Sequence, residues 1–266
     1  MTHNQLKKLA DTYGISLKYV TSWAPPHTDD LRPLIAMPNI VRPLQGDKCQ
    51  PRTILRPKEW NAMRRACYER ANDTCEICGE CPEDKRRRQS HEVFAVDYEH
   101  GTATFVGCVC LCQQCHLACI HNGRAITLYS KNSPLITKDF LLEGAEKAFT
   151  IISSYNKDHP EAGLRAYSTY VEYLKFDELR EPMLELIKKC DISFYSEDPK
   201  KMAKWGEWRL LLDGEEYPTP YKNEKEWEKA MEKKTYNDNF CKGVEINVKP
   251  LTDEEVREEH EKLKKF

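Results

Sequence analysis

"LCQQCHLACIHNGR", residues 111–124, holds two cysteines separated by two residues, a histidine directly after them, and a second histidine five residues later. Cys112 and Cys115 repeat the spacing of an earlier pair, Cys75 and Cys78, across thirty-three intervening residues. A two-residue gap lets a tight turn aim both sulfurs at one point, and two such pairs complete the tetrahedral thiolate shell that zinc prefers. The sequence therefore predicts a structural zinc site at these four cysteines.

The remaining cysteines leave the choice of ligands open. The chain has 12 cysteines, and clustered cysteines in a reducing compartment indicate metal rather than disulfides. Four of them are close enough in sequence to replace a member of the quartet: Cys81, Cys108, Cys110 and Cys119. The other four are isolated, and we expect them to be inert buried thiols: Cys49, Cys67, Cys190 and Cys241.

Composition limits the classes of function. The formal net charge is −2 over 266 residues, so any contact with nucleic acid must come from local basic patches rather than from a global positive field. No apolar run approaches the length of a membrane span, and the first residues lack a signal-peptide pattern. We expect an intracellular, cytoplasmic protein with no membrane partner.

Five segments are expected along the chain. They are a helical hairpin (1–24), a Pro-rich linker or wrapping arm (25–57), a zinc-binding finger with its preceding helix (58–130), a mainly helical region (131–235) and a charged C-terminal tail with a helix (236–266). The first segment reads either as a plain hairpin or as a helix-turn-helix that would turn Lys18, Tyr19, Thr21 and Ser22 outward. Within the finger, strands are expected over 91–98 and 103–110 and a short helix over 113–121. In the helical region, further helices are expected over 161–176 and from Pro182. The fold class is α+β.

The finger resembles zinc-binding HNH endonucleases of bacteria and phages. The resemblance rests on "CEICG" (75–79), "HEVFAVDYE" (91–99), "GCVCLCQQCH" (107–116) and "HNGRA" (121–125). It implies a ββα-metal finger, embedded here in a mostly helical chain. It also implies a metal-dependent endonuclease that hydrolyses phosphodiester bonds in DNA, in the host cytoplasm if the chain is phage-encoded.

The same resemblance assigns roles to individual residues. His91 would be the general base, His121 a ligand of a catalytic Mg or Mn ion, and His116 a second ligand or a phosphate contact. The zinc of the four cysteines would be structural. Basic residues that would contact nucleic acid are Lys85, Arg86, Arg87, Arg88 and Arg64. The alternative for the basic run at 85–88 is a solvated loop.

Three positions depart from the family pattern. His116 and His121 are five residues apart, one more than usual. On a regular α-helix residues five apart lie about 140° from each other around the axis, so either the helix ends or bulges before His121 or only one histidine binds metal. Gly107 stands where the family has an orienting asparagine, and Ser90 where a metal ligand often precedes the base. Asp97 and Glu99 are alternative but distant ligands.

Two functional hypotheses follow. The first is the endonuclease. The second, from a different class, is a zinc-stapled finger without catalysis that binds nucleic acid or a protein partner, as a regulator or an anti-defence factor. The helices after residue 136 either extend the DNA contact or form a homodimer interface. A single active site suffices to nick one strand, whereas a double-strand cut usually needs two.

Overall fold

The structure is a computed structural model, and it describes residues 2–20, 30–36, 41–80, 88–194 and 203–233. The chain divides into two units, Met1–Asn223 and Glu224–Phe266. The second unit contributes one described helix, α8 (Glu224–Lys233). Several sequence predictions lie outside the described residues: Thr21 and Ser22, the basic residues Lys85, Arg86 and Arg87, the cysteines Cys81 and Cys241, and the tail at 236–266.

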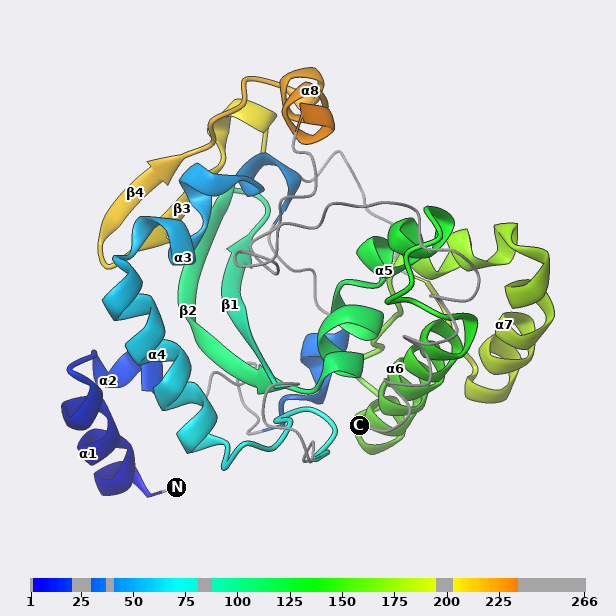
Figure 1. Cartoon of the computed structure of the whole chain (residues 1–266), viewed down its shortest axis with the longest axis horizontal. Helices are drawn as coiled ribbons and strands as arrows, with labels where there is room; N and C mark the ends of the chain where they lie inside the picture. Colours follow the sequence, from blue (N-terminus) through cyan, green and yellow to red (C-terminus); the bar gives the residue numbers. More distant parts are fainter. Residues whose placement is uncertain (1, 21–29, 37–40, 81–87, 195–202, 234–266) are drawn as a thin grey trace. The chain divides into compact units, whose positions relative to one another are not determined.

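The first unit is mixed α/β (Figure 1). Before the sheet come α1 (His3–Tyr13), α2 (Leu17–Val20), η1 (Arg32–Ile35), η2 (Arg42–Leu44), η3 (Asp47–Cys49), α3 (Pro51–Ile54) and α4 (Pro57–Arg70). After the first two strands come η5 (Gln114–Ile120), α5 (Asn122–Ser130), α6 (Lys138–Asp158), η6 (Ser168–Lys175), α7 (Asp177–Cys190) and η8 (Trp205–Glu207). No helix within the described ranges has both the length and the apolarity that a bilayer span requires.

A four-stranded sheet in the order β1-β2-β3-β4 carries the finger. Strands β1 (Gln89–Asp97) and β2 (Thr102–Leu111) form an antiparallel hairpin, as the sequence predicted over 91–98 and 103–110. Strand β3 (Arg209–Leu212) pairs parallel with β2, and β4 (Glu215–Pro218) closes the sheet antiparallel to β3. Strand β1 is therefore an edge strand of this sheet.

A β-bulge accounts for Gly107, which departs from the pattern that the resemblance to HNH endonucleases implies. The pairing shifts between Val93 and Phe94, so that Val93 faces Gly107 while Phe94 faces Phe105. Gly107 has φ +142°, a backbone conformation that favours glycine. An asparagine here would be strained, so the bulge accounts for the departure.

The two faces of the hairpin pack into different cores. Val93, Val109 and Leu111 belong to a cluster that includes η5, α5, α6, η6 and α7. Phe94 and Cys108 point the other way, into a cluster with α4 and β3. His91 is two residues before Val93, so both side chains lie on the same face of the strand, opposite to that of Phe94. His91 therefore faces the helices that follow the hairpin.

Residues 25–57 wrap the finger wherever they are described. Leu34 and Ile35 of η1 are buried in the cluster on the His91 side, whereas Leu44 and Cys49 are buried in the cluster on the opposite side. Proline stands in the first or second position of three of these helical turns, as Pro33 in η1, Pro43 in η2 and Pro51 in α3. The segment thus acts as an arm with a buried apolar face rather than as a spacer between units.

The N-terminal hairpin packs inward. Thr2 and Gln5 form a capping box at the start of α1, and Gly14 ends that helix in the left-handed conformation. Tyr19, which the helix-turn-helix alternative would turn outward, is only 5% exposed. Its ring packs on Phe105, and its hydroxyl donates to Asp213. The plain hairpin therefore describes this segment better.

The later helices differ from prediction at two places. A helix was expected over 161–176, but the structure has the 3-10 helix η6 only from Ser168. The Asn156 side chain bonds both the N–H and the carbonyl of Leu164, and this fixes a turn that includes Gly163 at φ +53°. Helix α7 begins at Asp177, before the predicted proline start at Pro182, because Asp177 and Glu178 favour its first turn.

Candidate metal centres

The four predicted cysteines converge on one point. Their sulfurs lie within 4.8 Å of one another, and Cys78 Sγ is 3.7 Å from Cys112 Sγ. Tetrahedral zinc with Zn–S bonds of about 2.3 Å separates its sulfurs by about 3.8 Å. Gly79, with φ +75°, closes the first knuckle by donating its N–H to Cys75 O. The donor set and its spacing fit a structural zinc ion.

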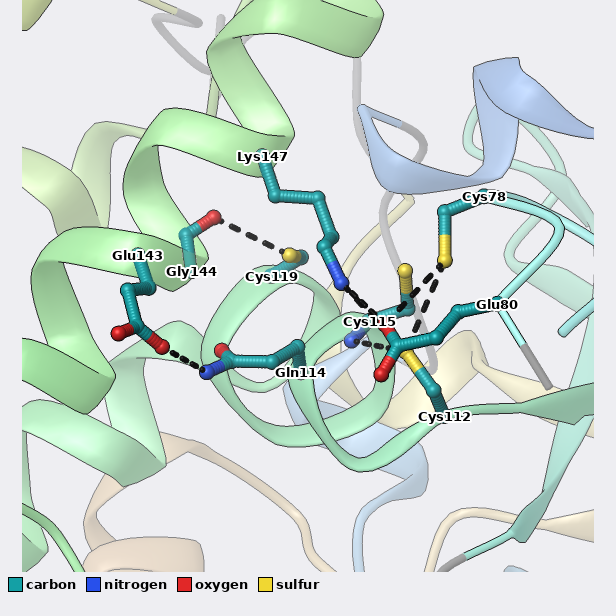
Figure 2. A network of polar contacts seen from close by, with 9 residues as sticks. All are labelled: Cys78, Glu80, Cys112, Gln114, Cys115, Cys119, Glu143, Gly144 and Lys147. Carbon is teal, nitrogen blue, oxygen red and sulfur yellow. Dashed lines mark hydrogen bonds and ion pairs between the residues drawn. The ribbon is translucent and has the colours of Figure 1, made fainter. Parts of the chain in front are cut away.

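A lysine from α6 accompanies the sulfurs (Figure 2). Lys147 Nζ lies 2.6 Å from Glu80 Oε2 and 3.9 Å from Cys112 Sγ. The Cys115 N–H also donates to Cys112 Sγ at 3.4 Å. Burial opposes the charge on Lys147, but Glu80 and the sulfurs raise its pKa above the ordinary value. This cation offsets the negative charge that four thiolates leave on a zinc site, so α6 is part of the site's surroundings.

The other described cysteines stand apart from this cluster. Burial raises the pKa of Cys108 and of Cys110 to about 12, and that of Cys49 to about 11. Cys119 instead donates its thiol to Gly144 O at 3.2 Å. Of the alternatives left open, Cys108, Cys110 and Cys119 do not belong to the group of described cysteines whose sulfurs lie within 4.8 Å of one another.

A π-helix places His116 and His121 together. Element η5, which holds His116, is a π-helix, and the His121 N–H donates to His116 O at 3.1 Å. This i→i+5 hydrogen bond brings residues five apart onto one side, which an α-helix does not do. Of the alternatives for the long gap, the bulge is the one observed. The two rings lie 4.9 Å apart between centroids.

His91 of β1 completes a second cluster. Its ring centroid is 5.4 Å from that of His116 and 5.1 Å from that of His121. One ring nitrogen from each histidine lies within 4.8 Å of the others, and no described carboxylate belongs to the group. His91 is 5% exposed, and its Nδ1 has no hydrogen-bond partner among the described residues. Three imidazoles from a strand and a π-helix thus face one point.

The surroundings keep two of these imidazoles neutral. Burial, then His121 and Arg52, hold the pKa of His91 well below its usual value. Burial acts first on the pKa of His116 as well, followed by His121, His91, Arg124 and Arg52. A neutral imidazole is the form that binds metal. Both histidines are therefore in a metal-binding form at neutral pH.

This donor set does not fit the expected Mg or Mn ion. Mg²⁺ takes oxygen ligands in octahedral geometry, and carboxylates or water also suit Mn²⁺, whereas imidazole suits zinc, copper, iron and nickel. Ser90 supplies no carboxylate before His91. Asp97 instead accepts hydrogen bonds from His100 at the hairpin end of β1. Three histidine nitrogens are instead a ligand set that zinc takes in proteins.

Two contacts hold the π-helix in place. Tyr170 of η6 is fully buried and donates its hydroxyl to Ala118 O at 3.1 Å. Asn122, 2% exposed and next to His121, accepts from Thr169 Oγ1 at 2.7 Å. These bonds satisfy groups near the irregular turn, where the α-helical ladder is interrupted. The histidine positions therefore depend on η6 as well as on the hairpin.

Helix α6 approaches η5 closely at Gly144, and this contact carries a prediction. A Cβ at Gly144 would overlap the Ala118 Cβ, so Gly144→Ala is expected to destabilise the fold by about 1–3 kcal/mol, although alanine favours a helix. Thermal unfolding followed by circular dichroism measures the change. Gly206→Ala is the control, because its nearest atom would be Lys222 O at 3.9 Å. Equal melting of both variants would contradict the close packing.

The described nucleic-acid candidates lie around Tyr68 of α4. The Arg88 guanidinium is 4.5 Å from the Tyr68 ring centroid, and that of Arg64 is 5.9 Å from it. Arg88 also pairs with Asp73. Arg64 and Arg88 are thus brought together, although 23 positions separate them in the sequence.

Sequence reasoning missed Arg52 and Glu92. Arg52 Nε lies 3.2 Å from Glu92 Oε1, and Arg52 acts electrostatically on His91 and His116. The adjacency of Glu92 to His91 was visible in the sequence, but no local signal links Arg52 to a residue forty positions later. Only the packing of the arm reveals the pair.

Comparison with known proteins adds no assignment. Searches of protein-family models, curated proteins and solved structures find no match to this chain.

Proposed function

We propose that this chain is a metal-dependent endonuclease of the HNH type that hydrolyses phosphodiester bonds in DNA. The observation that carries the proposal is the convergence of His91, His116 and His121 beside the four-cysteine cluster. The turn before β1, the hairpin and the helical turn after it supply both clusters, and a hairpin followed by a helix is the order of elements in a ββα-metal finger. The four-thiolate site is closed, so chemistry belongs to the histidines.

The cysteine cluster has a structural role in this proposal, and the histidine cluster has the chemical role. Cys112 and Cys115 fix the start of η5, and His116 follows directly. His116, His121 and His91 would hold a zinc-type ion, which supplies Lewis acidity toward a phosphoryl oxygen. His91 was assigned as general base by resemblance, but its ring faces the other two within ligand reach. We therefore assign His91 a ligand role.

The charge of the site favours an anionic substrate. Imidazole ligands bring no negative charge, so they would leave the charge of a divalent ion uncompensated, and no described carboxylate shares their cluster. Arg52 and Arg124 act on His116 as further cations. A phosphodiester supplies the missing negative charge, and Arg64 and Arg88 extend the basic surface along α4 and the start of β1.

One observation favours the binding-factor alternative. His91 is 5% exposed, which also suits a second structural metal site without catalysis. In that case the protein would hold two metal ions, bind DNA or a protein partner, and cut nothing.

Nicking of supercoiled plasmid distinguishes the two functions. We expect the zinc-loaded protein to nick DNA with added zinc or cobalt and to show little stimulation by magnesium. His121→Ala is expected to lose about 10²–10⁴-fold in rate. His100→Ala is the matched control, because His100 is exposed and pairs with Asp97 at the hairpin turn. Equal nicking by both variants, or none by the wild type with any metal, would overturn the endonuclease.

A further inference from the structure

The arm that precedes the finger contributes a charged side chain beside the histidine cluster. Arg52 lies on α3, a single turn begun by Pro51. Its guanidinium Nε is 3.2 Å from Glu92 Oε1, and Glu92 directly follows His91 in β1. The Arg52 side chain is 48% exposed, while that of Glu92 is 11% exposed. One end of this ion pair is therefore fixed in the protein, and the other remains open to a ligand.

The ion pair with Glu92 holds Arg52 at β1 one residue after His91, and the electrostatic effects agree with this position. Arg52 is among the charged groups that act on both His91 and His116, which come from different elements. Arg124 of α5 acts on His116 as well. Cations from the arm and from α5 thus border a cluster that contains no described carboxylate.

The Glu92 carboxylate holds the Arg52 guanidinium, a role that the sequence alone did not indicate. Neighbouring strand residues point to opposite faces, so Glu92 does not share the ligand point of His91. Its carboxylate instead fixes a planar guanidinium, whose remaining N–H groups match the geometry of a phosphate. An arginine held by one carboxylate loses less conformational freedom when it binds a second anion.

We propose that Arg52, positioned by Glu92 next to the three-histidine cluster, contacts a backbone phosphate of the DNA bound at that cluster. This inference rests on the proposed function, since it takes the phosphodiester of that site as its ligand. Arg52 is a substrate contact, and Glu92 is a positioning residue that acts through it. Helix α3 then forms part of the substrate site in addition to its packing role.

The test combines DNA binding and cleavage by the full chain loaded with zinc. Binding of a short fluorescent duplex is measured by anisotropy over a range of KCl concentrations, and plasmid nicking is measured in parallel. Arg52→Gln is expected to weaken binding about tenfold and to lower the slope of log K against log[salt] by about 1. Arg52→Lys is expected to restore the salt slope but only part of the affinity, because lysine keeps the charge without the planar fork.

Two controls separate this contact from charge and folding effects. Arg56→Gln removes the same charge four residues away, where Arg56 is 82% exposed and pairs with Glu59. Arg52→Gln combined with Glu92→Gln avoids leaving a carboxylate unpaired, so a fold lost in Arg52→Gln alone is expected to return in the double variant. Zinc content and melting temperature verify folding in each case.

The experiment distinguishes failure of the Arg52 contact from failure of the proposed nuclease function. A loss of affinity and salt slope specific to Arg52, in a wild type that also nicks DNA, supports both. The same loss in a wild type that never nicks supports the contact and rejects the nuclease. Equal behaviour of Arg52→Gln and Arg56→Gln, with nicking intact, rejects the contact and leaves the nuclease standing. A wild type that does not bind the duplex rejects the contact.

Discussion

Replacing Cys112 with serine is expected to remove the structural zinc and to unfold the finger. Three groups approach the Cys112 sulfur, namely Cys78 Sγ, the Cys115 N–H and Lys147 Nζ. Structural zinc contributes about 10–16 kcal/mol to the folding of zinc-finger peptides. A loss of even about 4 kcal/mol lowers the melting temperature of a chain of this size by about 10 °C or more.

The control for this variant lies on the same hairpin. Cys108→Ser changes a cysteine that is also 2% exposed, but the Cys108 side chain faces the opposite core and is not part of the sulfur cluster. Both variants bury a serine hydroxyl. The desolvation cost of about 1–3 kcal/mol in unfolding free energy is therefore common to the two. We expect zinc content, measured by mass spectrometry of the metal, to fall only in Cys112→Ser. Retention of a full equivalent there would contradict the quartet.

Local signals in the sequence were enough to predict the finger. The two-residue gaps place each cysteine pair in one turn, so Cys75 with Cys78 and Cys112 with Cys115 need no knowledge of distant packing. Two strand-like runs around a turn likewise predicted the hairpin within two residues at each end. Such features depend on neighbours in the chain, and for that reason composition and spacing reveal them.

The histidine geometry depended on a backbone irregularity that spacing alone left undecided. A five-residue gap is compatible with two separated rings or with a bulged helix, and the choice depends on what packs around η5. Tyr170 and Gly144 decide it here, since one bonds the irregular turn and the other allows close approach of α6. Both lie more than twenty residues after His121. No pattern within the motif contains that information.

The same limit applies to the arm and to its arginine. Proline-rich sequence without periodicity predicts an irregular path, but it does not say which core the apolar residues enter. Leu34 and Leu44 enter different cores, and Arg52 meets Glu92 across forty positions. These are long-range contacts, which follow from the assembled fold rather than from local propensity.

Replacing His91 with alanine is expected to abolish cleavage and also to remove the second metal. Both candidate roles predict the loss of cleavage, because either a missing base or a missing ligand costs about 10²–10⁴-fold or more. The general-base role and the ligand role of His91 differ in the metal binding that they predict for the variant. Residues that only orient ligands already contribute about 10–100-fold to metal affinity, so loss of a ligand is expected to weaken the histidine site by at least about 100-fold. The zinc of the four cysteines is expected to remain.

Metal stoichiometry separates the roles without reference to activity. The wild type is expected to bind two zinc ions per chain, and His91→Ala one. His100→Ala, at the hairpin turn, is expected to keep both. His91→Gln fills most of the volume of the buried imidazole, so it shows whether a cavity alone causes any instability. If His91→Ala keeps two zinc ions with unchanged affinity yet loses cleavage, His91 is the general base. The ion is then held by His116 and His121 alone, as the resemblance to HNH endonucleases implied.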